Sequence, residues 1–321
     1  MRFYLTLGLL SLAAFLVFVF SLSYGATTFD LFHLSPLEKE ILWRVRLPRV
    51  LLAGLCGATL SLAGLLFQYV MKNPLADSFT TGVSASSAMG GVLALLLGQG
   101  RLLPLFALGT GLGGLVAVYY IASFRGRIQP VTMLLAGIII NTFASAVISL
   151  VKYLSEDSVS SIVFWLMGSF QWASFPRVGV LLSALFLSFI LLLPHSLALD
   201  LLAFDEKTAT TSGVDLFRLR RKLFFLATLL TAISVSYTGI IGFVGLIVPH
   251  LLRLLGFLRA KELLPLVLLF GLVFMMGNDL LARVILPEGQ ELPVGIITSC
   301  LGGLFFLNLL VKKKKELYGF D

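Results

Sequence analysis

Apolar residues dominate ten stretches of the chain, and charged or turn-forming residues separate these stretches. Most are close to the 20 or so residues that a helix needs to cross a bilayer. The third and eighth are the shortest. The pattern predicts ten membrane-spanning helices, at Phe3–Ser23, Val50–Val70, Ser84–Gly98, Leu102–Phe124, Val131–Leu154, Val178–Leu193, Leu219–Tyr237, Ile240–Leu255, Leu263–Leu281 and Val294–Val311.

The composition agrees with this pattern and excludes a water-soluble domain. Of the 321 residues, 58% are hydrophobic and 12% are charged, whereas soluble globular chains carry about 25% charged residues. We therefore expect one all-α, polytopic membrane domain over residues 1–321. A cleaved signal peptide is the alternative for the first stretch, with a weak cleavage site at Ser23–Ala26. Its apolar run is longer than the roughly 7 to 15 residues of a signal peptide, which favours a retained helix.

The distribution of lysine and arginine predicts the orientation. With the amino terminus in the cytoplasm, sixteen of the 24 basic residues fall in inner loops and eight in outer loops. This bias places both termini in the cytoplasm, in a multi-pass protein of the inner (plasma) membrane. Because the basic residues lie in loops, the net charge of +8 indicates contact with anionic lipid, above all at Lys312–Lys315, and no nucleic acid.

Side chains with catalytic or metal-binding chemistry are scarce within the predicted spans. Asp279 is the one acidic residue that falls inside them, which disfavours a proton- or sodium-coupled carrier and an intramembrane hydrolase. Cys56 and Cys300 both lie in apolar runs, so a disulfide framework or a zinc site lacks ligands. The three histidines lie far apart near span ends. We expect no catalytic, cofactor-binding or metal-binding residues in this chain.

A basic cluster ends the outer segment before the second span. Arg44, Arg46 and Arg49 lie within six residues of one another, on the side where positive charge is normally scarce. Such arginines either reach the interface along their apolar stems or hold the carboxylates of an acidic partner in paired hydrogen bonds. We expect a docking edge for an acidic partner, with interfacial snorkelling as the alternative.

The longest inner segment, Ala198–Lys222, mixes apolar and acidic residues at helical spacing. Leu199 belongs to an apolar face, Asp205 and Glu206 fall elsewhere, and Gly213 suits the end of a short helix. The segment is predicted to lie on the membrane surface. It is either a simple linker or a surface that receives force from a soluble subunit.

Glycines recur at every third position at the start of the run from Gly239 to His250. Gly239, Gly242 and Gly245 would allow close approach of a neighbouring helix. We expect them to keep that helix packed while it moves.

Polar side chains share one face of the fifth span. Thr142, Ser145 and Ser149 lie on that face, which suits either the wetted wall of a translocation path or hydrogen bonding between helices. A weakly polar wall without fixed charge fits a bulky chelate. It suits a bare metal ion poorly, because ions need rings of carbonyls or carboxylates.

Several short motifs follow one another along nearly the whole chain. They are RLPR at 46–49, KNPLAD at 72–77 followed by GVS at 82–84, LLAG at 134–137, WLMGS at 165–169, GIIGFVGLIVPHLLR at 239–253, LLP at 263–265 and ELPVGIIT at 291–298. In these motifs and their order the chain resembles the permease subunits of ATP-binding-cassette importers for iron-siderophores, haem and vitamin B12, often called the FecCD family.

The resemblance implies a type II importer permease: a homodimer of ten-helix subunits around a central path, with two cytoplasmic ATPase subunits and a periplasmic or lipid-anchored binding protein. In that family the inner loop before the seventh span faces the ATPase. The residues that would do so here are Leu199, Phe204, Asp205, Glu206, Ala209, Thr210 and Gly213. The family's outer arginines hold glutamates of the binding protein, a role that would fall to Arg46, Arg49 and Arg283.

No GxxxxGK[ST] phosphate-binding loop occurs in the sequence. ATP would therefore be bound by the partner subunits, and this chain would be neither an enzyme nor the holder of a cofactor. The expected cargo is an iron chelate, a ferric siderophore first, with cobalamin, haem, or molybdate or tungstate as alternatives. An ion-coupled secondary carrier and a non-transport membrane protein are the competing classes.

Overall fold

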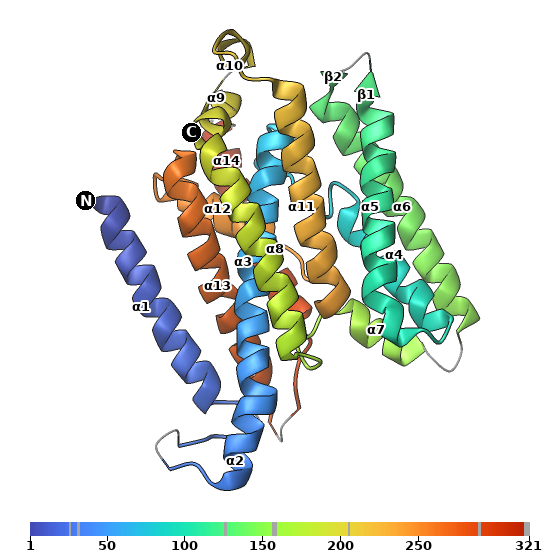
Figure 1. Ribbon diagram of the computed structural model, residues 1–321, viewed down its shortest axis with the longest axis vertical. Coiled ribbons are helices and arrows are strands. Elements are labelled where there is room, and N and C mark those ends of the chain that lie inside the picture. Colours follow the sequence, from blue (N-terminus) through green and yellow to red (C-terminus); the bar gives the residue numbers. More distant parts are fainter. Residues whose placement is uncertain are drawn as a thin grey trace.

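The computed structural model describes residues 1–25, 27–30, 33–124, 127–155, 159–204, 206–287 and 290–317. These residues form a bundle of long helices that run alongside one another (Figure 1). Each of the ten predicted apolar stretches coincides with a helix. The ten helices are α1 (Arg2–Ser23), α3 (Leu47–Met71), α4 (Val83–Leu96), α5 (Leu103–Ala122), α6 (Pro130–Leu154), α8 (Phe175–Leu192), α11 (Leu216–Thr238), α12 (Val244–Leu254), α13 (Ala260–Val284) and α14 (Val294–Leu317).

Short elements connect these helices at the two ends of the bundle. One antiparallel pair of two-residue strands links α5 to α6, with Ser123 opposite Ile128. The short elements are α2 (Pro36–Ile41), the π-helical turn η1 (Leu42–Arg46), the 3-10 turns η2 (Gly100–Leu102) and η4 (Leu193–His195), strands β1 (Ser123–Phe124) and β2 (Arg127–Ile128), α7 (Val159–Leu166), α9 (Ser196–Phe204) and α10 (Glu206–Thr211).

Not every helix meets the usual length for a membrane span. Six helical stretches in the described part of the chain are long and apolar enough to cross a membrane, and α4, α12 and the apolar part of α14 are shorter. Of the ten helices, α11 is also outside these six. It is 23 residues long, but four basic residues in its first two turns shorten its apolar part. The short helices α4 and α12 are accommodated because neighbouring helices, and not lipid alone, surround much of their backbone.

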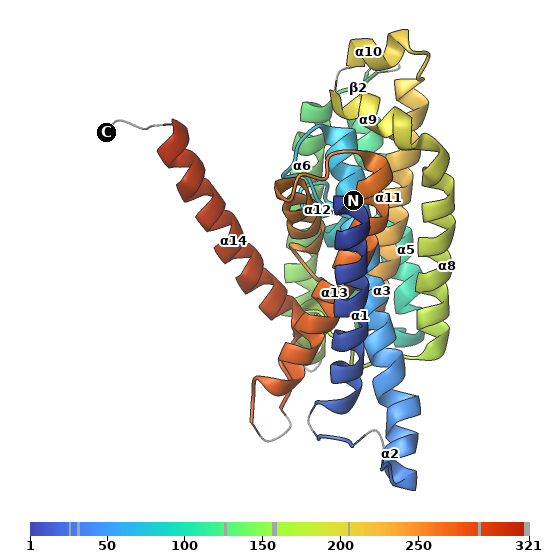
Figure 2. The same cartoon turned by 90° about the vertical axis from the view of Figure 1, so that its left-hand side faces the viewer.

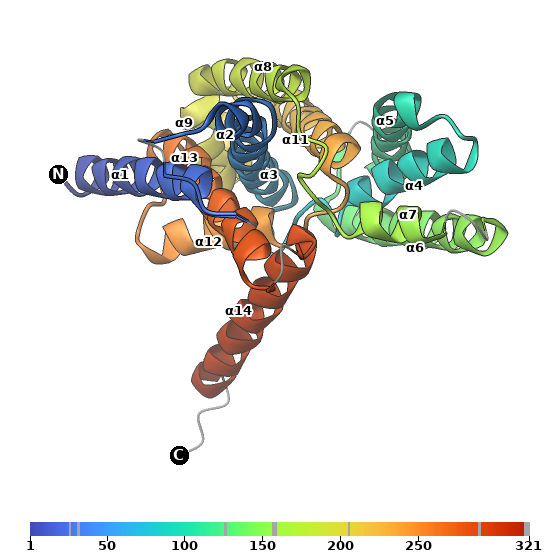
Figure 3. The same cartoon turned by 90° about the horizontal axis from the view of Figure 1, so that it is seen from below.

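The helix at the centre of the bundle is α3, which continues from α2 and η1 and is buried over almost its whole length. It is surrounded by α8, α11, α12 and α13 (Figure 3). A helix that is apolar on all sides is expected in such a position. Its small residues let α13 approach closely: a Cβ atom at Gly57 would lie 2.1 Å from the carbonyl oxygen of Gly271. Such contacts between small residues are the usual way in which membrane helices pack.

Two helices lie at the edges of the bundle. Helix α1 packs along α13, and its outward side exposes large apolar residues such as Leu5, Leu9 and Phe15. Helix α14 leaves the body at an angle and contacts α12 and α13 (Figure 2). Its apolar side chains Leu304 and Leu307 are exposed. In the view of Figure 3, α14 points away from the rest of the bundle, in a different direction from α6 and α7.

Candidate functional site

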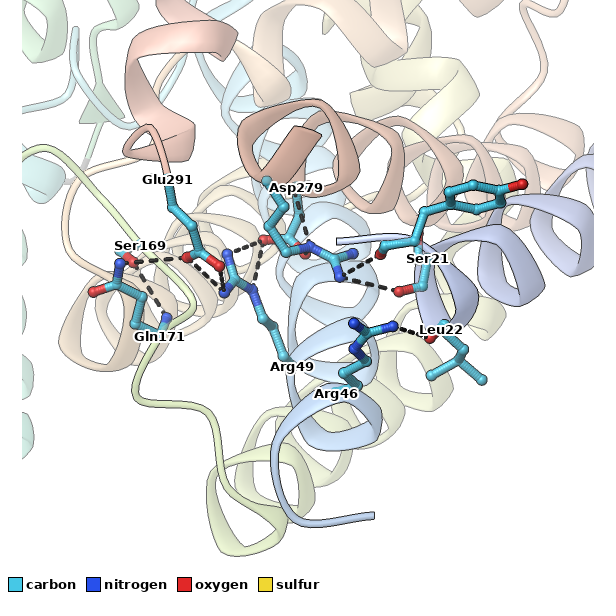
Figure 4. A network of polar contacts seen from close by, with 10 residues as sticks. Ser21, Leu22, Arg46, Arg49, Ser169, Gln171, Asp279 and Glu291 are labelled. Carbon is cyan, nitrogen blue, oxygen red and sulfur yellow. Dashed lines mark hydrogen bonds and ion pairs between the residues drawn. The ribbon is translucent and has the colours of Figure 1, made fainter. Parts of the chain in front are cut away.

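The three outer arginines lie at the end of the bundle opposite α10, on two neighbouring helical stretches. Arg46 ends η1 and Arg49 follows in the first turn of α3, while Arg283 lies in the last turn of α13. All three are buried, with 6%, 8% and 3% of their surface exposed, respectively. A buried guanidinium needs acceptors for its hydrogen bonds, and each of these arginines has them within the chain (Figure 4).

Arg46 binds the carboxyl-terminal end of α1. Its Nη1 atom donates hydrogen bonds to the carbonyl oxygens of Leu22 at 2.7 Å and Ser23 at 2.9 Å. Its Nη2 atom donates to the carbonyl oxygen and, at 3.0 Å, to the hydroxyl of Thr27. Its guanidinium also lies 3.6 Å from the ring centre of Phe29. The last carbonyls of a helix lack internal partners and carry partial negative charge, so the arginine completes the end of α1.

Arg49 joins α3 to two carboxylates that are distant in sequence. It donates from Nε to Asp279 Oδ1 at 3.0 Å and from Nη1 to both oxygens of Glu291, at 2.9 and 2.8 Å. In the second contact a single nitrogen reaches both oxygens of the carboxylate, and both hydrogen bonds are charge-assisted. Gln171, in the loop between α7 and α8, donates to Glu291 at 3.4 Å. Arg49 therefore connects α3, α13 and the segment that leads into α14.

Arg283 shares Asp279 with Arg49 and reaches α1 as well. Its Nε atom lies 3.1 Å from Asp279 Oδ2, one helical turn away. Its Nη1 atom donates to the carbonyl oxygens of Ser21 at 3.0 Å and Tyr24 at 3.1 Å. Asp279 is 1% exposed and lies between two guanidinium groups. We call the five residues Arg46, Arg49, Asp279, Arg283 and Glu291 the outer arginine network.

In the predicted orientation, the outer arginine network explains why arginines accumulate on the side where positive charge is normally scarce. Its arginines meet carboxylates and helix carbonyls inside the protein, so they add little exposed positive charge. Docking of a binding protein on Arg46, Arg49 and Arg283 stays a prediction, and in this conformation the three guanidinium groups already have internal partners. Asp279 was recognisable in the sequence as the one acid within a span, but its partners were not.

Arg44 behaves differently from the three arginines near it. Its side chain is 79% exposed and pairs with Glu40 at 3.2 Å, one helical turn earlier. The short helix α2 that carries Glu40 starts with a capping box between Ser35 and Glu38. Arg44 is thus the accessible arginine of the predicted docking edge.

The inner segment before α11 folds into two short helices, α9 and α10, as its helical spacing predicts. Among the residues expected to face an ATPase, Leu199 and Ala209 are fully buried, whereas Thr210 and Gly213 are exposed. Leu199 and Ala209 therefore attach the segment to the bundle and do not form its outer surface. Asp205 lies outside the described residues, as do the side chains of Phe204 and Glu206.

We call residues 198–213, which carry α9 and α10, the coupling segment after its predicted role. An acidic residue on α9 fixes this segment to α13. Asp200 Oδ1 accepts a hydrogen bond of 2.6 Å from the backbone N–H of Ala260, the first residue of α13. A carboxylate at this position satisfies a free N–H group and interacts favourably with the helix dipole. Because α13 also carries Asp279 and Arg283, one continuous helix connects α9 at the inner end with the outer arginine network.

The polar face of the fifth predicted span, on α6, is accessible in the single chain. Thr142, Ser145 and Ser149 are exposed, and the Thr142 hydroxyl donates to the carbonyl oxygen of Ile138 at 2.9 Å. The same side of α6 exposes Leu135 and Ile138. A wall of a path and a contact with another helix are both compatible with this exposure, so the path assignment stays a prediction.

The glycine run is only partly helical, which corrects the predicted start of the eighth span from Ile240 to Val244. Gly239 ends α11 with φ of 72°, and a Cβ atom there would lie 1.9 Å from the carbonyl oxygen of Trp165. Gly242 lies in the connection beside the ring of Phe79. Gly245 alone lies on a helix, where a Cβ atom would approach Gly64 Cα to 3.0 Å.

A cavity at the outer end lies beside the short helix α7, which the apolar pattern did not predict. The cavity has a volume of about 600 Å³, and its lining includes Trp165, Trp172, Arg177 and Tyr237. Arg177 donates to the carbonyl oxygen of Trp172 at 2.7 Å and lies over the ring of Tyr237. The eight residues of α7 are too few for a span, which is why run length did not reveal them.

Comparison with known proteins gives one consistent result. The model of the FecCD transport family matches residues 7–312. The molybdate import system permease protein MolB of Haemophilus influenzae is 37% identical over 287 residues, covering 88% of this chain and 84% of MolB. The vitamin B12 import system permease protein BtuC of Klebsiella pneumoniae is 34% identical over 287 residues, covering 88% and 85%.

A solved structure is similar over nearly the whole chain. It is described as an inward-facing conformation of a metal-chelate type ABC transporter, and it superimposes with a TM-score of 0.87 at 34% sequence identity. The match covers 96% of this chain and 99% of that one. The similarity therefore includes the peripheral helices α1 and α14 as well as the central bundle.

Proposed function

Because the chain belongs to the FecCD transport family, we propose that it forms the membrane path of an importer for a metal chelate, with a ferric siderophore as the first cargo to test. It is the permease subunit of an ATP-binding-cassette importer, with the type II permease fold, and not an enzyme. Permeases of this type function with ATPase subunits and a binding protein. The observation that carries the proposal is the family match over residues 7–312.

Force from two cytoplasmic ATPase subunits would enter through α9 and α10. ATP and its chemistry belong to those subunits, and this chain holds no cofactor. Thr210 and Gly213 are exposed on the segment, while the buried Leu199 and the Asp200–Ala260 hydrogen bond join it to the bundle. A push on α9 would therefore move α13 as a rigid rod, and α13 would carry the displacement to the outer arginine network.

Two copies of the chain would enclose the path. Both the apolar side of α14, which includes Leu304 and Leu307, and the polar face of α6 are exposed in the single chain. A second copy would cover the apolar surface, and Thr142, Ser145 and Ser149 would then line the shared space. A weakly polar wall would let a bulky chelate pass without holding it.

The protein is a multi-pass membrane protein of the importer permease class, and we place α10 and both termini in the cytoplasm. The start of α1 and the end of α14 lie toward the α10 end of the bundle (Figures 1 and 2). The excess of basic residues in the loops of that end supports the same orientation. Three of the eight outer basic residues are buried in the outer arginine network, which strengthens the asymmetry of exposed charge.

The test is ATP-dependent transport of cargo across the membrane of proteoliposomes that contain the complete complex. The binding protein is supplied on the side opposite α10, and ATP is supplied on the α10 side. Radiolabelled ferric siderophore, cobalamin, haem and molybdate would be compared. We expect ATP-dependent uptake of a ferric siderophore. The control is a complex whose ATPase subunit lacks the lysine of its phosphate-binding loop, which should abolish uptake.

Two outcomes would contradict the proposal at different levels. Uptake of molybdate or cobalamin alone would change the proposed cargo, while the assignment as an importer would stand. Uptake that persists without ATP and follows an imposed ion gradient would replace the mechanism by that of a secondary carrier.

A further inference from the structure

A groove between α5 and α11, at the inner end of the bundle, has an apolar wall and a basic rim. Its volume is about 580 Å³. Helix α5 contributes Leu115, Val116 and Tyr119, and α11 contributes Phe225. Three cations close the inner end of the groove: Arg218, Arg221 and Lys222. Helices α5 and α11 lie side by side here, with the rings of Tyr119 and Phe217 6.3 Å apart.

The three cations are close together because they lie on one helix face. Positions 218, 221 and 222 are three and four residues apart, so their side chains project from the same side of α11. Arg218 forms an exposed ion pair with Asp215 at 3.0 Å. In the part of the chain that the structure describes, Arg221 and Lys222 form no ion pair with a carboxylate. Arg221 stacks over Phe217, and Lys222 donates to the carbonyl oxygen of Leu191 at 3.1 Å.

This arrangement contrasts with the outer arginine network, where buried arginines have internal carboxylates. At the groove, three cations lie beside an apolar surface, and among the described residues only Arg218 is paired with a carboxylate, that of Asp215. A ligand that matches both features must carry an anionic group joined to a hydrocarbon chain. Basic pockets between transmembrane helices at the cytoplasmic side bind the head groups of anionic phospholipids.

We propose that the groove binds one anionic phospholipid of the inner leaflet. Its phosphodiester would contact Arg221 and Lys222, with Arg218 nearby, and an acyl chain would lie against Leu115, Val116 and Phe225. Because α11 follows directly on the coupling segment, the bound lipid would fix the start of α11 against α5. Only the choice of leaflet rests on the proposed orientation, since binding itself depends on the groove alone.

The experiment is native mass spectrometry of the full-length chain, purified with its ATPase subunits and titrated with phosphatidylglycerol or with phosphatidylcholine of the same acyl chains. We expect phosphatidylglycerol to bind preferentially. The variant Arg221→Gln/Lys222→Gln should reduce that preference about thirtyfold, because each basic residue near the surface contributes a factor of about five to the affinity for anionic lipid. The matched control, Arg259→Gln/Lys261→Gln, removes the same charge from exposed positions at the α12–α13 connection and should retain the preference.

A second variant tests the apolar wall without changing charge. Val116→Trp should fill the groove and weaken phosphatidylglycerol binding, while thermal unfolding without added lipid reports whether either variant folds. If Arg221→Gln/Lys222→Gln does not fold, the Val116→Trp result decides. Inorganic phosphate should not compete at millimolar concentration, because it lacks the acyl chain.

Three results would overturn the proposal. The first is equal binding of the two lipids. The second is an equal loss of preference in the Arg259→Gln/Lys261→Gln control, which would indicate general charge attraction. The third is unchanged lipid binding with loss of the ATPase subunits in Arg221→Gln/Lys222→Gln, which would make the groove a protein contact. All three leave the importer assignment untouched, because ATP-dependent uptake is measured separately.

Discussion

The outer arginine network and the basic rim of the groove, at opposite ends of the bundle, differ in how their arginines are buried. At the outer end, Arg49 and Arg283 are buried and contact carboxylates or helix carbonyls of the same chain. At the inner end, Arg218 and Arg221 are exposed beside an apolar groove. The residue type is the same, but burial decides its role. A buried charge must be satisfied within the fold, whereas an exposed one is available to lipid, solvent or a partner.

This difference predicts how charges at each end contribute to the stability of the fold. The outer arginine network ties α1, α3, α13 and the segment before α14 together through directional bonds, so its removal should cost stability. At the inner end, charges such as Arg221, Arg259 and Lys261 are exposed, so their removal should alter binding or coupling and leave the fold unchanged. Four substitutions test this contrast.

The largest effect is expected from Asp279→Ala. The change leaves Arg283 buried without a carboxylate and removes one of the two acidic partners of Arg49, which should lower the free energy of unfolding by about 3 to 5 kcal/mol. Thermal unfolding of the purified protein in detergent, followed by tryptophan fluorescence, measures this. The control Glu40→Ala breaks the exposed pair with Arg44 and should produce no measurable shift. Equal shifts in the two variants would refute the contrast between buried and exposed pairs.

Arg46→Lys should have the second largest effect. A single ammonium group cannot reach the carbonyls of Leu22 and Ser23 and also those of the Thr27 region, since it lacks the planar fork of a guanidinium. We expect a loss of about 1.5 to 3 kcal/mol, typical of hydrogen bonds to charged groups. Arg44→Lys is the matched control, because Arg44 is exposed and should tolerate the change. If Arg46→Lys unfolds like the wild type, Arg46 does not stabilise the end of α1.

Asp200→Ala tests a carboxylate at the inner end that joins two helices, because Asp200 on α9 accepts a hydrogen bond from the first residue of α13. Losing the bond to Ala260 N–H should cost about 1 kcal/mol, as for a helix cap, and should lower the cargo imported per ATP hydrolysed. Asp200→Asn keeps an oxygen acceptor and should retain most of that ratio. The measurement is uptake and ATP hydrolysis in the same proteoliposomes. An unchanged ratio in Asp200→Ala would remove this contact from the coupling pathway.

The smallest effect on stability is expected from Arg259→Gln/Lys261→Gln. Both side chains are exposed at the inner end, so the free energy of unfolding should change by less than about 0.5 kcal/mol. The same fluorescence assay applies. A shift as large as that of Asp279→Ala would mean that charges at the inner end also hold the fold together.

The helices were predictable because few backbone structures are stable in the hydrocarbon core of a membrane. Backbone N–H and C=O groups in the hydrocarbon region must bond internally, so a long apolar run becomes a helix. All ten predicted stretches are helices for this reason. The short helix α7 was not predicted because an eight-residue run is too short to indicate a span. Gly242 was assigned to the eighth span, because the length of an apolar run does not show that α12 begins only at Val244.

The arginines show where prediction from local sequence stops. Arg46 and Arg49 stood out as charges in an unusual place, and an acidic partner was expected for them. Acidic partners for Arg49 were found inside the chain, 230 and 242 residues away at Asp279 and Glu291. Residues so distant in sequence are brought together only by the packing of α3 against α13, which no local pattern records.

By itself the sequence determined that this protein lies in a lipid membrane, where its helices are, in which order they follow, and which family it resembles. Apolar run length and the positions of basic residues act locally and can be counted along the chain. Only the tertiary structure decided which charges are buried, which residues of the coupling segment face inward, and where a basic rim meets an apolar groove. These properties depend on how helices from distant parts of the chain pack, because packing alone determines whether a charge meets a partner, lipid or water.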